Sequence, residues 1–160
     1  MVFPKSAVKR LYREIEKERE KGGDTQLHFI EDPFDRDRLS YIRLWTQIRG
    51  CDIVFTISNK YPFKPPLIDI TYGGGRYLKY YRDLLCSSYN EEIKNMTGKK
   101  CLCCESITCL DNWSPMMNIK QIIDEIKQNM IIKDRLYERL VAKQLIHQKL
   151  NKDIPLLSYL

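Results

Sequence analysis

The chain has 160 residues and a mass of 19.1 kDa, the size of one domain, and its 43% apolar and 30% charged residues are typical of globular proteins. No apolar run reaches the roughly 20 residues that a bilayer crossing requires, and no cleavable apolar segment opens the sequence, so we expect an intracellular protein, cytoplasmic or nuclear, with no membrane partner. The net charge of +6 comes from 27 basic and 21 acidic residues that are mixed along the chain, which gives no sign of a nucleic-acid partner.

The first predicted element is a helix that starts near Ser6, a candidate N-cap, and ends before Gly22-Gly23. Val8, Leu11 and Ile15 recur at the spacing that places them on one face. The opposite face is charged: Lys9, Arg10, Arg13, Glu14, Glu16 and Lys17. The pattern predicts an amphipathic helix that packs on a core.

Strand-like segments follow at residues 26–30, 41–48, 51–58 and 67–72. Arg49-Gly50 between the second and third segments predicts a tight hairpin. Residues 61–66, Tyr-Pro-Phe-Lys-Pro-Pro, contain three prolines, which exclude both helix and central strand and predict a rigid extended crossing. A glycine triplet ends the last strand.

The second half is predicted to be irregular and then helical. Residues 77–85 have the composition of a short helix, and the cysteine-rich segment follows them. A strong helix starts near Asn118, its candidate cap, and continues to Met130, and a further helix is expected over 134–150. The order of these elements predicts a single α+β domain over 1–160.

Three local sequences resemble the ubiquitin-conjugating enzyme (E2) family. Residues 61–66 match the family's Tyr-Pro-Phe-x-Pro-Pro crossing, and residues 45–57 resemble its second and third strands. Cys101-Leu102, followed by Trp113-Ser114-Pro115 and a helix, resembles the segment that carries the family's nucleophile. These signals occur in the family's order, and the resemblance covers roughly residues 5–130.

The resemblance implies a UBC-like fold and an acyl transfer. The fold has an N-terminal helix, a four-stranded antiparallel meander sheet, an irregular active-site segment and C-terminal helices. A cysteine accepts ubiquitin or a ubiquitin-like protein as a thioester from an activating enzyme (E1). It passes the modifier to a lysine of a protein substrate, usually with a ligase (E3). No cofactor is expected.

Four cysteines are candidates for the nucleophile. Cys101 is preferred, because Leu follows it, Gly98-Lys99-Lys100 precedes it, and Trp113 stands twelve residues later. Cys104 and Cys109 are the alternates: Cys104-Glu105-Ser106-Ile107 and Cys109-Leu110-Asp111 each resemble family sequences, but Cys109 lies too near Trp113. Cys86 lies at the family's usual distance from the proline crossing but would need a long insertion after it.

The resemblance also suggests where partners bind. Phe63 and Pro115 correspond to positions where family members meet ligases, one on each of two neighbouring loops. The basic face of the first helix, including Lys9, Arg10 and Arg13, corresponds to the contact with the activating enzyme. Each feature has a plainer interpretation, as a core residue, a helix-start proline or a solvated helix face.

The chain departs from the family in several places. The His-Pro-Asn segment is absent, residues 73–100 are predicted to be an insertion, and residues 131–160 form a divergent helical tail. The oxyanion-stabilising asparagine is therefore not identified, and Asn90 and Asn95 are candidates by residue type only. These departures favour an alternative in which the chain is an inactive E2 variant that acts as a binding module.

A zinc site is the other interpretation of the cysteine cluster. Cys101, Cys103, Cys104 and Cys109, with Cys86 as a further candidate, offer enough thiolates for tetrahedral zinc. Only Cys101 and Cys104 have Cys-x-x-Cys spacing. This interpretation predicts a zinc-stabilised interaction domain, in which metal binding and catalysis compete for the same thiols.

Overall fold

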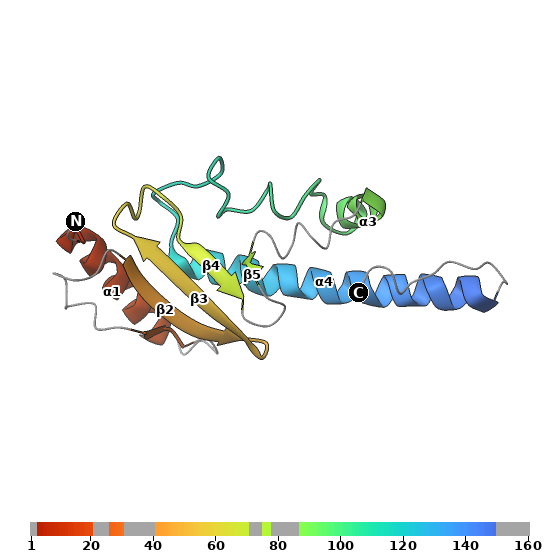
Figure 1. Cartoon of the computed structure of the whole chain (residues 1–160), viewed down its shortest axis with the longest axis horizontal. Helices are drawn as coiled ribbons and strands as arrows, with labels where there is room; N and C mark the ends of the chain where they lie inside the picture. Colours follow the sequence, from red (N-terminus) through yellow and green to blue (C-terminus); the bar gives the residue numbers. More distant parts are fainter. Residues whose placement is uncertain (1–2, 21–25, 31–40, 71–74, 78–86, 150–160) are drawn as a thin grey trace.

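The computed structural model describes residues 3–20, 26–30, 41–70, 75–77 and 87–149 (Figure 1). Its elements, in chain order, are α1 (Lys5–Glu20), β1 (His28–Phe29), β2 (Tyr41–Ile48), β3 (Cys51–Ser58), β4 (Leu67–Ile70), β5 (Gly75–Arg76), α3 (Ser87–Thr97) and α4 (Ile119–Lys149). The predicted α+β class is confirmed. Across these described segments, no helix combines the length and apolar character needed to traverse a membrane.

The strands form one antiparallel sheet in the order β1-β2-β3-β4-β5. The predicted four-stranded meander is present as β1 to β4, and the two-residue β5 extends it, so Gly75 begins a strand and does not end one. The Arg49-Gly50 hairpin is confirmed: Ile48 pairs with Cys51, and both turn residues have positive φ, 51° and 79°. A two-residue turn of this kind matches the right-handed twist of the strands.

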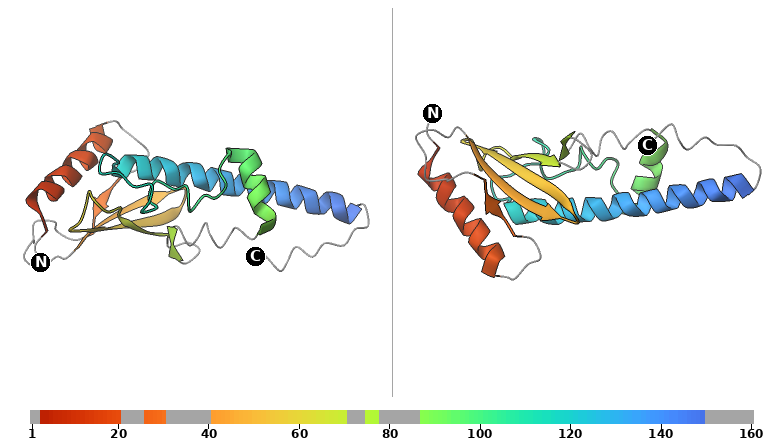
Figure 2. Two further views of the ribbon diagram at one scale, coloured as in Figure 1. Left: turned by 90° about the horizontal axis from the view of Figure 1, so that it is seen from above. Right: turned by 60° about the horizontal axis from the view of Figure 1, so that its bottom comes forward.

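One face of the sheet packs with α1 and α4 around a single core. Alternate residues of β2 and β3 are buried, as the period of a strand with one covered face requires. The N-terminal half of α4 runs along the sheet, and α1 lies beside the N-terminal end of α4 (Figure 2). The buried residues that these elements contribute include Val8, Leu11, Ile15, Leu44, Phe55, Ile57, Ile122 and Ile126.

Two local predictions are corrected. Helix α1 begins at Lys5, and the Pro4 carbonyl accepts hydrogen bonds from the N–H groups of Ala7 and Val8, so Ser6 lies in the first turn and is not the cap. The crossing at residues 61–66 excludes helix and strand as expected. It is not fully extended, however, because Phe63 and Lys64 donate to the Lys60 carbonyl and form a turn. The Tyr61-Pro62 bond within it is cis.

The two predicted C-terminal helices are one helix. α4 runs unbroken for 31 residues, about 46 Å at the rise of an α-helix. Residues 131–133 contain neither glycine nor proline, and buried Ile132 and Leu136 continue the apolar face past Met130. The predicted cap at Asn118 is confirmed, because its Oδ1 accepts the Gln121 N–H and the Gln121 side chain accepts the Asn118 N–H, both at 3.0 Å.

α3 packs against the C-terminal half of α4 and belongs to the segment predicted to be an insertion (Figure 1). Glu92 of α3 pairs with Arg139 and Lys143 of α4 at 3.2 and 3.1 Å. The predictions for residues 71–72, the short helix at 77–85 and the end of the tail at 150–160 lie wholly or largely outside the described residues.

Candidate functional site

The two segments that carry the family resemblance meet in space. Trp113 Nε1 donates to the Pro62 carbonyl at 2.7 Å, across 51 positions of sequence. The Tyr61 and Trp113 rings lie 6.3 Å apart between centroids. The crossing after β3 and the Trp-Ser-Pro segment before α4 are therefore fixed to each other, and Trp113 has a structural role.

Glu14 of α1 joins these segments to the two helices. Its carboxylate accepts hydrogen bonds from the Tyr61 hydroxyl at 2.9 Å and from the Ile119 N–H, at the start of α4, at 3.0 Å. Arg10 donates to the same carboxylate at 2.7 Å. An anion at a helix N-terminus is favourable, because it meets unpaired N–H groups and the positive end of the helix dipole. Burial, and then the Glu14 charge, raise the pKa of Tyr61, which keeps its hydroxyl a donor.

The predicted partner-binding residues have different settings. Arg10 also donates to the Met117 carbonyl at 2.7 Å and lies over the Tyr61 ring, so it links α1 to the crossing and to the segment before α4. Lys9 and Arg13 are exposed. Phe63 is 77% exposed, and Pro115 is exposed on the segment to which the crossing is bonded. Next to Pro115, Met116 is 88% exposed.

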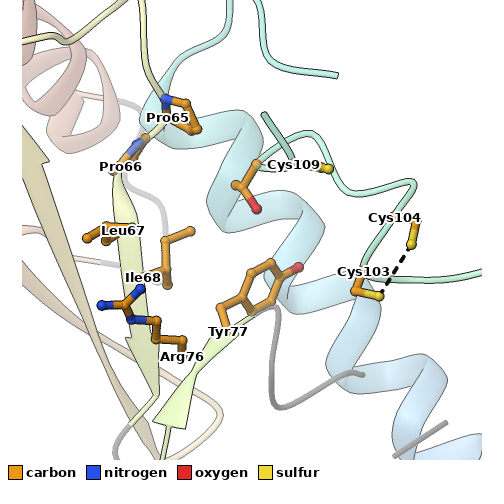
Figure 3. A pocket seen from close by; sticks show the side chains of 10 residues that line it. Pro65, Pro66, Leu67, Ile68, Arg76, Tyr77, Cys103, Cys104 and Cys109 are labelled. Carbon is orange, nitrogen blue, oxygen red and sulfur yellow. Dashed lines mark hydrogen bonds between the residues drawn. The ribbon is translucent and has the colours of Figure 1, made fainter. Parts of the chain in front are cut away.

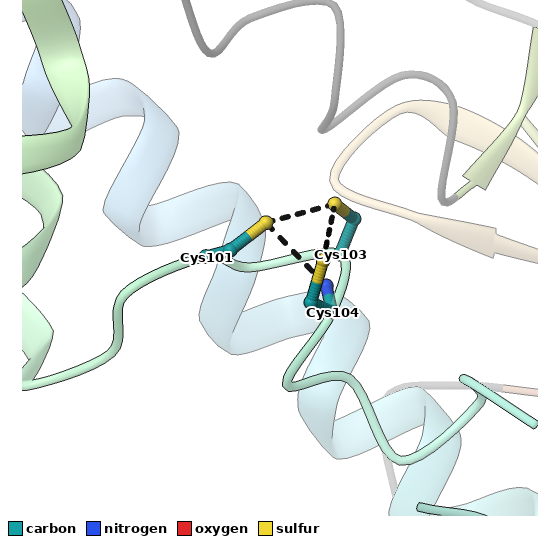
Figure 4. Close-up of side chains that lie close together, drawn as sticks. All are labelled: Cys101, Cys103 and Cys104. Atoms are coloured by element: carbon teal, nitrogen blue, oxygen red, sulfur yellow. Dashed lines mark hydrogen bonds between the residues drawn. The ribbon is translucent and has the colours of Figure 1, made fainter. Parts of the chain in front are cut away.

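Three cysteines lie together in the irregular segment between α3 and α4 (Figure 4). The sulfur atoms of Cys101, Cys103 and Cys104 all lie within 4.8 Å of one another. The Cys101 and Cys103 sulfurs are 2.8 Å apart, and those of Cys103 and Cys104 are 3.7 Å apart. The Cys104 N–H donates to the Cys101 sulfur at 3.4 Å.

A tight turn holds these thiols. Gly98, with φ 73°, ends α3 by donating to the Lys94 carbonyl, and the chain then turns at Cys101. Glu105 closes the turn twice: its N–H donates to the Cys101 carbonyl, and its carboxylate accepts the Lys100 N–H at 2.7 Å. Leu102 is 3% exposed and anchors the turn in the core.

The three thiols differ in acidity. Burial raises the pKa of Cys101, but hydrogen bonds from the Cys103 thiol and the Cys104 N–H outweigh it, so the net pKa is below that of an ordinary thiol. Burial, and then its hydrogen bond to Cys101, raise the pKa of Cys103 to about 12. The hydrogen bond with Cys101 raises the pKa of Cys104. The cluster therefore favours a single thiolate, on Cys101.

Cys109 lies apart from the three thiols, on the wall of a cavity of about 410 Å³ (Figure 3). The cavity lies between the end of the crossing, β4 and the cysteine segment. Its lining includes Pro66, Ile68, Tyr77, Cys103, Cys104 and Cys109. Cys104 is the exposed member of the thiol group and lines this cavity, whereas Cys101 is half-buried and is not one of the residues that line it.

Half-buried Glu125 and buried Asn129, both on α4, support the cysteine segment. Glu125 of α4 accepts the Ile107 N–H at 3.0 Å, and Asn129, one turn along, donates to the Tyr77 hydroxyl at 2.7 Å. Burial raises the pKa of Glu125, although hydrogen bonds from Ser106 and from Ile107 oppose the shift. Within the described segments, Glu125 Oε1 and Asn129 Oδ1 have no hydrogen-bond partner.

Several predicted site residues are not brought to the thiols. Cys86 lies outside the described residues, Asn95 is exposed on α3, and Asn90 lies at the start of that helix. Asn112 was missed: its amide donates to the carbonyls of Cys104 and Ser106 at 2.7 and 3.0 Å and so shapes the segment.

Glu14 and Glu125 were also missed as structural residues. For Glu125 a signal existed, since an acidic residue and Asn129 interrupt the apolar face of α4 four positions apart. For Glu14 the sequence offered only a candidate ion pair with Arg10, four residues earlier, because its other partners, Tyr61 and Ile119, are distant in the chain.

Comparison with known proteins adds no assignment. Neither models of known protein families, nor curated proteins, nor solved structures gave a match to this chain. Assignment to a family is therefore a proposal that depends on the motifs and contacts described above.

Proposed function

We propose that this chain is a divergent ubiquitin-conjugating (E2) enzyme with a UBC-like fold. In this proposal it carries ubiquitin or a ubiquitin-like protein as a thioester on Cys101. An activating enzyme supplies the modifier, and a lysine amine of a protein substrate, positioned by a ligase, accepts it.

The hydrogen bond from Trp113 to Pro62 is the observation that carries this proposal. This bond joins, across 51 positions of sequence, the two segments whose residues resemble those of the family. The antiparallel meander, the preceding α1 and the cysteine segment between the joined parts supply the expected surroundings. Fold and motif thus agree at more than one level.

The acidity of the thiols supports Cys101 as the nucleophile. Thioester exchange needs a thiolate that is reachable, and Cys101 is the member of the group whose pKa is lowered. Cys103 and the Cys104 N–H donate hydrogen bonds to its sulfur. When an amine attacks the thioester, the Cys104 N–H, which lies 3.4 Å from this sulfur, would be near the reacting carbon and available to stabilise the oxyanion.

The cavity beside the thiols gives the modifier's C-terminal tail a place to lie. It borders Cys103 and Cys104, and its walls are mainly apolar side chains such as Pro66 and Ile68. The exposed Phe63, Pro115 and Met116 would form the ligase-binding surface, and the exposed Lys9 and Arg13 would meet the activating enzyme.

A second candidate function is an inactive E2 variant that binds partners without transfer. The observation that favours it is the commitment of the Asn112 amide to two backbone carbonyls, which leaves this asparagine no hydrogen for an oxyanion. This candidate keeps the ligase-binding surface and predicts no thioester.

A charging assay separates the two candidates. The zinc-free protein is incubated with activating enzyme, ATP and ubiquitin and analysed with and without reducing agent. We expect a reducible adduct on the wild type, on Cys104→Ser, on Cys109→Ser and on the matched control Cys51→Ser, but not on Cys101→Ser. Absence of an adduct with ubiquitin and related modifiers, while a known E2 is charged in the same mixture, would favour the binding module.

A further inference from the structure

We propose that Cys101, Cys103 and Cys104 form a zinc site with three protein ligands and one open position. The observation is the gathering of three sulfur atoms within 4.8 Å of one another on one turn. Zinc takes thiolate ligands at about 2.3 Å, which places the sulfurs of a tetrahedral site about 3.8 Å apart. The Cys103 and Cys104 sulfurs are already 3.7 Å apart.

Little movement completes the site. The Cys101 and Cys103 sulfurs, 2.8 Å apart, must separate by about 1 Å to reach the spacing of a tetrahedral zinc–thiolate site. We expect rotation of the thiol side chains to supply this change, while the Glu105 hydrogen bonds and buried Leu102 hold the backbone of the turn. Zinc replaces the three thiol protons, which leave to solvent, and the complex carries one net negative charge.

The surroundings suit such a complex. The Cys104 N–H already donates to the Cys101 sulfur, which is the kind of hydrogen bond that orients a metal ligand. Lys99 and Lys100 stand immediately before the turn and offset the negative charge of the complex. Cys109 does not belong to the group of three sulfurs, so a water or a further ligand fills the fourth position.

Zinc binding at this site would reversibly block the Cys101 thiolate. A thiolate bound to zinc is not free to accept an acyl group, so the zinc-bound chain would not be charged. This consequence alone rests on the proposed function, since zinc binding requires neither modifier nor activating enzyme.

Cobalt binding tests the site directly. The reduced, metal-free full chain is titrated with Co²⁺, and the charge-transfer absorption of cobalt–thiolate bonds is recorded, followed by displacement with Zn²⁺. We expect one equivalent to bind. Ser variants at Cys101, Cys103 or Cys104 should each lower the absorption by at least about one third, because one of three thiolates is lost. The controls Cys51→Ser and Cys109→Ser should keep it.

Thiol protection in the wild type gives a second measurement that needs no variant. Zinc should protect Cys101, Cys103 and Cys104 from alkylation, mapped by mass spectrometry, and leave Cys51 and Cys109 unprotected. Equal alkylation of the three with and without zinc, or an equal loss of cobalt absorption in Cys109→Ser, would overturn the site. A chain that binds cobalt but is never charged would instead contradict the proposed function alone.

Discussion

The frame of the molecule and its cysteine segment are stabilised in different ways. The frame, formed by α1, the sheet and the first half of α4, has a continuous apolar core and regular backbone hydrogen bonds. Residues 98–117 contain neither helix nor strand. Side-chain bonds from Asn112, Glu105 and Glu125, with buried Leu102, hold that segment.

The frame therefore determines stability, and the cysteine segment determines thiol reactivity. The frame can tolerate little change, because buried side chains interlock there. The cysteine segment exposes thiols whose acidity depends on a few hydrogen bonds, so single substitutions should alter reactivity without unfolding the chain. Variants that affect stability and variants that affect charging should therefore fall in different parts of the molecule.

The largest expected effect is Phe55→Ala in β3. Phe55 is fully buried, and removing its ring should lower the free energy of unfolding by about 3–5 kcal/mol. Phe63→Ala is the matched control, because Phe63 is 77% exposed and its loss should change stability by less than about 0.5 kcal/mol. Urea denaturation of both variants measures the contrast. Equal losses would mean that the crossing is part of the core.

Glu14→Gln should have the next largest effect. The neutral side chain weakens bonds from Arg10, Tyr61 and the Ile119 N–H, and we expect a loss of about 1–3 kcal/mol in unfolding free energy. Glu16→Gln, on the exposed face of the same helix, should change stability little. Denaturation curves that coincide for the two variants would argue against Glu14 as the residue that joins the frame.

Asn118→Ala should cost about 1 kcal/mol, because it removes the side-chain cap of α4. Gln128→Ala, at an exposed position inside the same helix, is the control. Thermal unfolding should show a lower midpoint for the cap variant only. Because Asn118 is not part of the group formed by Cys101, Cys103 and Cys104, the same variant should still be charged with most of its ubiquitin.

The smallest expected effect is a change in pH dependence from Glu125→Gln. The raised folded-state pKa of Glu125 means that its contribution is fully present below the ordinary value of 4.5 and is lost as pH rises through the folded value. Wild-type stability relative to the Gln variant should therefore fall as pH increases above about 4.5. Glu138→Gln, exposed on the same helix, should run parallel to wild type. Denaturation midpoints measured from pH 4 to 8 make the comparison.

Local sequence patterns predicted most of the frame. Amphipathic spacing predicted α1, and Arg49-Gly50 and Asn118 marked a turn and a cap that the structure contains. The division of α4 into two helices was wrong, since no residue breaks it. α3 was missed because its 11 residues lie in the segment between β5 and the cysteines, which was predicted to be an irregular insertion.

The candidate site was only partly predictable. Sequence proximity made a cluster of Cys101, Cys103 and Cys104 foreseeable, but not the order of their acidities, which depends on which thiol receives hydrogen bonds. The bond between Trp113 and Pro62 spans 51 positions, and a single sequence does not encode such pairs in any local pattern. Long-range polar contacts of this kind are what the structure adds.

Intact-mass analysis of zinc-free wild type and Cys101→Ser, after incubation with activating enzyme, ATP and ubiquitin, tests whether Cys101 carries the modifier. We expect one ubiquitin on the wild type, removed by reducing agent. On the Ser variant we expect either no adduct or one that resists reducing agent and yields to hydroxylamine. A folded, zinc-free wild type that stays unmodified beside a charged control E2, or a reducible adduct that persists in Cys101→Ser, would contradict this role of Cys101.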